Sequence, residues 1–312
     1  MPSPGVLTRA AVLSLAALAA PITHATEKGM PTTAAGVQDF GAGFMPPTTP
    51  FGTVGMRISD YQARVIKDSH GKDNGNDFNI NINVLAIGLA YLRMTDQQLF
   101  GARYGFGVVS VFFRMDADLG IDAGGQRVFS DSAELFRPAD VQLIPLILDW
   151  RPAPGVGINT QLSIQAPTGD YDKDRLVSPG TNHWTVSPIL NASYISPSGL
   201  ELSSSFQLDI NARNAATDYR SGVEYRHEFA VGQHVGDWTL GLGGYYYRQL
   251  SDDDAPGLTR GNRARVLALG PAVSFFQPTS GLPAIWLHAY KEFEARNRAE
   301  GYTVALRIGA SF

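Results

Sequence analysis

Among the last eleven residues of the chain, every second side chain is apolar, without a break. Thr303, Arg307 and Ser311 fall on one side of this alternation. The other side is an apolar row that ends on the C-terminal aromatic residue: Tyr302, Val304, Leu306, Ile308, Ala310 and Phe312. Successive side chains of a β-strand point to opposite faces, so the segment predicts a strand with one apolar face and one face in contact with water.

A final aromatic residue in phase with such a row resembles the C-terminal signal that the barrel-assembly machinery reads in bacterial outer-membrane proteins. When the last strand of a barrel pairs with the first, both sheet edges disappear and the backbone is satisfied in lipid. We therefore predict an all-β fold, a transmembrane antiparallel β-barrel. Lipid and lipopolysaccharide of the outer membrane are its expected surroundings.

The same alternation recurs upstream and is clearest over 200–211, where Leu202 and Phe206 oppose Glu201 and Asp209. It is less regular elsewhere, and the segment at 77–93 loses its phase after Val84. An even number of strands is typical of these barrels. We predict twelve, at 52–67, 77–93, 102–119, 140–151, 155–167, 183–195, 199–212, 219–231, 236–250, 264–277, 281–295 and 300–312.

The connections between these segments alternate in length. Four are short and rich in Pro, Gly and Ser, at 151–155, 196–199, 232–236 and 277–281. The longer ones carry more charge and include 68–76, 120–139, 168–182 and 251–263. Short turns at one end and long loops at the other are typical of outer-membrane barrels. Charged residues are only 17% of the chain, below the roughly 25% of a soluble domain.

The N-terminus has the pattern of a secretory signal peptide. Arg9 supplies a positive charge, an apolar run from Ala10 to Ile22 follows, and Ala25 ends a small-residue cleavage site. We divide the chain into a signal peptide (1–25), a Gly- and Pro-rich segment (26–51) and the barrel (52–312). Both termini of the mature chain are expected in the periplasm.

Charged residues of both signs fall on the predicted lumen face: Arg57, Glu201, Asp209, Arg220, Glu224, Arg226, Glu228 and Arg307. They either pair with one another and fill the interior, or set the selectivity of a pore and hold a plug. Residues 26–51 cannot form a ladder of their own, but Phe40, Phe44 and Met45 offer apolar anchors. This segment is thus either a lumen plug or a free periplasmic tail.

Several chemistries lack support in the sequence. There is no cysteine, and a net charge of −4 gives no reason to expect a nucleic-acid partner. The run from Asp170 to Asp174 opens like a calcium loop but has Arg175 where the turn needs glycine. A lipid hydrolase would need a serine near a histidine, and His183 lies near Ser178 and Ser187, without a hydrolase motif. We predict no cofactor, no metal and no catalytic residue.

Short motifs in a fixed order give the mature chain a family resemblance. They are Thr26–Thr33, Gly41–Gly52, Ala90–Met94, Tyr104–Gly107, Ala166–Tyr171 and Lys291–Phe293. The chain resembles the outer-membrane proteins named for the MetA pathway of phenol degradation. This resemblance implies a passive channel or porter for small hydrophobic or aromatic solutes. A lipid-modifying hydrolase and a structural barrel without transport remain the alternatives.

Overall fold

The computed structural model describes residues 26–73, 78–124, 126–258, 262–277 and 281–312. The predicted signal peptide and part of the predicted turn at 277–281 lie outside this range. The regular structure of the described chain is almost entirely β-strand, and its one short helix is a single 3₁₀ turn, η1 (Glu27–Gly29). Among the described residues, no helix has both the length and the apolar character needed to cross a bilayer.

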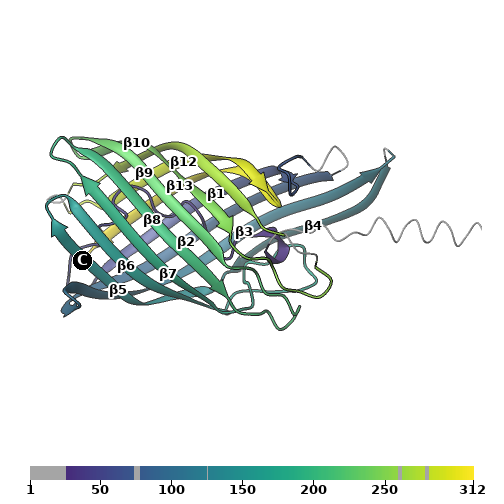
Figure 1. The fold of residues 1–312 in the computed structure, drawn as a ribbon, viewed down its shortest axis with the longest axis horizontal. Helices are drawn as coiled ribbons and strands as arrows, with labels where there is room; N and C mark the ends of the chain where they lie inside the picture. Colours follow the sequence, from purple (N-terminus) through teal and green to yellow (C-terminus); the bar gives the residue numbers. More distant parts are fainter. Residues whose placement is uncertain (1–25, 74–77, 125, 259–261, 278–280) are drawn as a thin grey trace, which may run out of the picture.

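Thirteen strands form one antiparallel sheet (Figure 1). Their bounds are β1 (Thr53–Lys67), β2 (Phe78–Leu99), β3 (Ala102–Ala123), β4 (Gln126–Pro138), β5 (Val141–Ala153), β6 (Val156–Ala166), β7 (Thr185–Ile195), β8 (Leu200–Asn211), β9 (Glu224–Val235), β10 (Trp238–Gln249), β11 (Arg265–Phe275), β12 (Ala284–Arg296) and β13 (Arg298–Ser311).

Twelve of these strands close into a ring, which confirms the predicted barrel. The last strand, β13, pairs with β1, and β1 pairs with β2, which continues to β3. The first part of β3, Arg103 to Val109, pairs with β5, and from β5 to β13 each strand pairs with the next. The ring therefore has no open edge, as a backbone in lipid requires.

The prediction of a loop at 120–139 was wrong. The second part of β3, Phe112 to Ala123, continues past the barrel and pairs with β4, the strand outside the ring. In Figure 1 this hairpin projects far beyond the other strands. Most of β4 is exposed, because β3 is its single partner among the described strands. Without a packed partner face, β4 shows no clean apolar alternation from which a strand could be predicted.

Strand β8 shows how the sequence alternation becomes two faces. Leu202 is 48% exposed on the outside of the barrel, whereas Glu201 is 2% exposed inside it. Phe206 and Asp209 repeat this contrast further along the strand. An apolar outer face with a polar interior is the arrangement of a barrel that meets lipid.

The two ends of the barrel differ as the sequence predicts. One end, here called the turn end, carries the tight connections after β5, β7 and β9 and the C-terminal Phe312. The other, the loop end, carries the longer connections at 167–184, 212–223 and 250–264. The strands before and after each tight turn pair directly, as in a hairpin.

Candidate functional site in the barrel lumen

Residues 26–52, here called the lumen segment, run through the barrel from one end to the other. At the loop end, the backbone N–H of Thr26 donates to Asp253 Oδ2 over 2.8 Å. At the turn end, Phe51 and Gly52 exchange backbone hydrogen bonds with Phe312. The expectation that both termini lie on one side was therefore wrong. An extended chain spans up to roughly 3.3–3.6 Å per residue, so this segment is long enough to cross.

Strands β8 and β9 give the lumen an acidic wall. The carboxylate of Glu228 accepts the backbone N–H groups of three consecutive residues, Gly36, Val37 and Gln38, with Oε1 2.9 Å from the Gly36 nitrogen. Three N–H groups converging on one carboxylate are charge-assisted hydrogen bonds, about twice as strong as neutral ones. The middle of the lumen segment is thereby held to β9.

Three further carboxylates of this wall contact the lumen segment. Glu224 accepts from the Thr32 backbone over 3.1 Å and from its hydroxyl. The Thr33 hydroxyl donates to Asp209 Oδ2 over 2.7 Å. The Gly41 backbone N–H donates to Glu201 Oε1 over 2.6 Å. The segment has no ladder of its own, so these side chains replace one by satisfying its buried donors.

The opposite wall, on β1 and β13, is basic. Arg57 and Arg307 stand directly opposite each other in the pairing of these two strands. Like charges placed this way repel. The lumen segment compensates for this: Gly36 and Val37 offer their carbonyls at 2.9 and 3.1 Å to the two guanidinium groups. Asp39 adds a carboxylate 2.8 Å from Arg307.

Asp39 also faces His288 on β12, whose Nδ1 lies 3.0 Å from Asp39 Oδ2. Asp39 and His288 are both buried. Sequence reasoning missed this pair. His288 falls on the inward face of a strand whose alternation is mixed, and nothing in the sequence marks Asp39 as its partner.

Arg226 is the one arginine within the acidic wall. Its Nε lies 3.2 Å from Glu228 Oε1, and its Nη2 lies 3.9 Å from Asp209 Oδ2. It also donates to the Thr33 carbonyl over 2.9 Å. Because all three charged side chains are at most 4% exposed, they form a dry network that includes the lumen segment.

The predicted lumen-lining residues divide into two groups. Seven of them contact the lumen segment: Arg57, Glu201, Asp209, Glu224, Arg226, Glu228 and Arg307. Arg220 does not, and its placement was wrong, because β9 begins only at Glu224. Arg220 lies in the preceding loop and pairs with Asp254 at the surface, 3.2 Å away. The apparent alternation through Arg220 is a loop that happens to continue the phase of the strand.

The three predicted plug residues anchor the turn-end half of the segment. Phe40 is 1% exposed and packs among Tyr245, Tyr290 and neighbouring alanines. The Phe44 ring lies 4.6 Å from the Arg151 guanidinium carbon. Met45 packs against the buried cluster of Met94, Ile144 and Ile147. Apolar anchors thus alternate with polar contacts along the segment.

Gly43 lets the segment touch the barrel wall backbone to backbone. A Cβ on Gly43 would lie 2.2 Å from the Ser193 nitrogen and 2.3 Å from the Gly157 carbonyl oxygen. The Gly43 N–H already donates to the Ser193 hydroxyl over 2.8 Å. This close approach gives a physical reason for the glycine in the Gly41–Gly52 motif.

We expect Gly43→Ala to loosen the lumen segment at the turn end. Neither clashing atom belongs to a flexible side chain, so the segment must shift, at a cost of about 1–3 kcal/mol. The free energy of unfolding in detergent, measured by denaturant titration, should fall accordingly. Gly55→Ala is the matched control, because its Cβ would meet its nearest atom at an ordinary 3.6 Å. Equal losses in the two variants would contradict the role of this contact.

The side chains considered for other chemistries have structural partners. His183 Nδ1 lies 3.3 Å from the Thr185 hydroxyl, whereas Ser187 donates to Asp209 over 2.6 Å. These bonds do not join a serine to His183. In the run that resembles a calcium loop, Asp170 pairs with Arg175 at 2.6 Å. Among the described residues, no group of three His, Cys, Asp or Glu side chains is placed to hold a metal.

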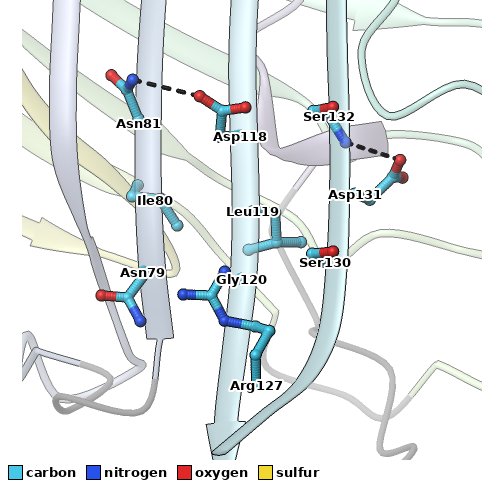
Figure 2. A pocket seen from close by; sticks show the side chains of 10 residues that line it. All are labelled: Asn79, Ile80, Asn81, Asp118, Leu119, Gly120, Arg127, Ser130, Asp131 and Ser132. Carbon is cyan, nitrogen blue, oxygen red and sulfur yellow. Dashed lines mark hydrogen bonds between the residues drawn. The ribbon is translucent and has the colours of Figure 1, made fainter.

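A hollow of about 560 Å³ lies outside the lumen, on the projecting part of β2, β3 and β4 (Figure 2). Its lining is mostly polar, and Asn81 donates to Asp118 across it over 3.3 Å. The Arg127 side chain covers Gly120 at its edge. No residue predicted as a site lines this hollow, so the lumen is the site that both sequence and structure select.

The twelve-stranded ring, its apolar outer face and its charged interior define the class: an outer-membrane β-barrel. Within this class, the sequence profile of the family described as "Putative MetA-pathway of phenol degradation" matches residues 63–308. The chain belongs to this family.

Two solved structures are similar to this chain, and the first of them supports the fold. An outer membrane channel from Pseudomonas putida F1 is 15% identical, with a TM-score of 0.65 over 86% of this chain and 97% of that chain. The β domain of the Bordetella autotransporter BrkA is 11% identical, with a TM-score of 0.48 over 84% of this chain and 99% of that chain. No protein of curated function matches the sequence. At 15% identity, the likeness to the channel concerns the fold alone.

Proposed function

We propose that the protein is a passive outer-membrane channel for small solutes, with the lumen segment as its plug. The turn end faces the periplasm and the loop end faces the outside, as in other barrels with this sorting of connections. One observation carries the proposal. The lumen segment contacts both the acidic wall of β8 and β9 and the basic wall of β1 and β13, and so bridges the bore.

For the transported solute we propose small hydrophobic or aromatic compounds. The family description refers to phenol degradation, and the fold relative from Pseudomonas putida F1 is named as an outer membrane channel. Within the lumen, Tyr245, Tyr247 and Tyr290 are buried beside Phe40. Aromatic faces of this kind bind aromatic solutes by stacking or edge-to-face contact.

The test is uptake into liposomes that contain the purified protein. Labelled 4-hydroxybenzoate should enter faster than a linear sugar acid of similar size and charge, because the tyrosine-lined part of the lumen favours the aromatic ring. Empty liposomes give the background for each solute. Equal rates would contradict the substrate class and leave the channel in place. Uptake of neither solute, whether by the wild type or by a variant that lacks residues 29–48, would contradict the channel itself.

We also propose that the apolar row on β13 is the assembly signal. Phe312 is 61% exposed at the end of this row. Phe312→Ala should therefore lower the amount of folded barrel in the outer membrane several-fold, measured by heat-modifiable migration on gels. Leu282→Ala, which removes another exposed apolar side chain at the turn end, is the control. Equal amounts of all three proteins would contradict this role.

A further inference from the structure

The backbone of Thr26 has a conformation that a β-branched residue rarely adopts. Its φ is 64° and its ψ is 154°, a region that is occupied almost entirely by glycine. The φ rotation is defined by the carbonyl carbon of the preceding residue. Cleavage of the peptide bond before Thr26 removes that carbon and with it the strain.

The nitrogen of Thr26 lies against a carboxylate that has no cation. Asp253 Oδ2 is 2.8 Å away and also accepts from the Tyr219 hydroxyl. Among the described residues, no Lys, Arg or His side chain pairs with Asp253, whereas its neighbours Asp252 and Asp254 both pair with arginines. Burial raises the pKa of the Asp253 carboxyl, and the hydrogen bonds that it accepts, from neutral groups such as Tyr219 and Gly222, offset this only in part.

The next residue is fixed just as closely. The Glu27 carboxylate accepts from the Tyr171 hydroxyl over 2.9 Å, from the Thr217 hydroxyl over 2.8 Å and from the Asn214 amide over 2.9 Å. These three donors come from two loops, and Asp253 comes from a third. The loop end thus surrounds the first two residues of the lumen segment with matched partners.

We propose that the chain is cleaved between Ala25 and Thr26 and that the freed α-ammonium of Thr26 forms an ion pair with Asp253. Signal peptidase is the class of enzyme that carries out this hydrolysis. Water adds its hydroxyl group to the Ala25 carbonyl and a hydrogen to the Thr26 nitrogen, which takes up a further proton at neutral pH. The ammonium then offers three donors where the peptide offered one. This pairing does not depend on whether the barrel conducts.

The first test is made on protein purified from outer membranes in detergent. Intact mass and N-terminal sequencing should place the first residue at Thr26. The folded protein is then treated with an amine-acylating ester near pH 7, and peptide mass spectrometry follows labelling of the α-amine relative to the lysines. Wild type should label slowly. Asp253→Asn should label about tenfold faster. Without the carboxylate the pKa of the Thr26 α-ammonium falls, and a fall of about one raises the reactive, unprotonated fraction about tenfold.

Asp252→Asn is the control for this experiment, because Asp252 lies next to Asp253 but pairs with Arg263, 2.6 Å away. It should label at the wild-type rate. A second variant keeps Asp253 and inserts Gly-Ser before Thr26, which moves the ammonium away from its site. This variant should label as fast as a free peptide, so the test does not depend on folding of Asp253→Asn. A different N-terminal residue, or slow labelling of the insertion variant, would overturn the proposal.

Discussion

Deletion of residues 29–48 should raise the conductance of the protein in planar bilayers several-fold. These residues carry the contacts to the acidic wall and to Arg57 and Arg307, as well as the side chains of Phe40, Phe44 and Met45. Without them the space between the two walls is open to water. The barrel itself should remain, because every strand pairing of the ring lies outside the deleted range.

A peptide of residues 26–50 supplies the control for this deletion. Added to the deletion variant, it should lower the conductance again, whereas a peptide of scrambled order should not. Equal conductance of wild type and deletion variant would mean that the lumen segment does not close the bore. If neither conducts, the channel proposal fails and lipid hydrolysis is tested next, beginning with His183.

Arg226→Met should lower the free energy of unfolding by about 3–5 kcal/mol, the loss typical when one partner of a buried ion pair is removed. The variant leaves Asp209 and Glu228 in the dry network without their cation. It also removes a donor from the Thr33 carbonyl. Denaturant unfolding in detergent micelles, followed by tryptophan fluorescence, measures the change.

Arg114→Met is the matched control for Arg226→Met. It breaks the ion pair with Glu134 on the projecting hairpin, where the two side chains are 61% and 69% exposed. A surface pair contributes about 0–1 kcal/mol, so this variant should unfold close to wild type. A loss in Arg226→Met no larger than in Arg114→Met would show that the buried network does not stabilise the barrel.

The fold was predictable from the sequence because apolar and polar residues alternate over about a dozen positions in a strand. Such alternation shows that one face of the strand is outside the barrel and the other is inside it. Leu202 and Glu201 are adjacent in sequence, yet one meets the outside of the barrel and the other its interior. The limits of this reasoning also have a physical cause. Alternation can continue by chance into a loop, as at Arg220, and a strand without a packed face, such as β4, need not alternate at all.

The partners within the candidate site were less predictable than its members. Charges on an inward face could be read as lumen residues, because such charges are costly in lipid. The partner of each charge depends on the path of the lumen segment through the barrel. Asp39, for example, contacts His288 and Arg307, which lie 249 and 268 residues further along the chain. A segment without periodicity carries no local signal of such contacts.

The threading of the lumen segment also orders the folding of the molecule. Many of its contacts join residues 26–45 to β7, β8, β9, β12 and β13, at separations of 150 residues or more. None of them can form until the C-terminal half of the chain has taken its place. Contacts between such distant residues are slow to form, because the entropy of closing a long loop is lost first. The first part of the mature chain to leave the ribosome is therefore among the last to reach its final position.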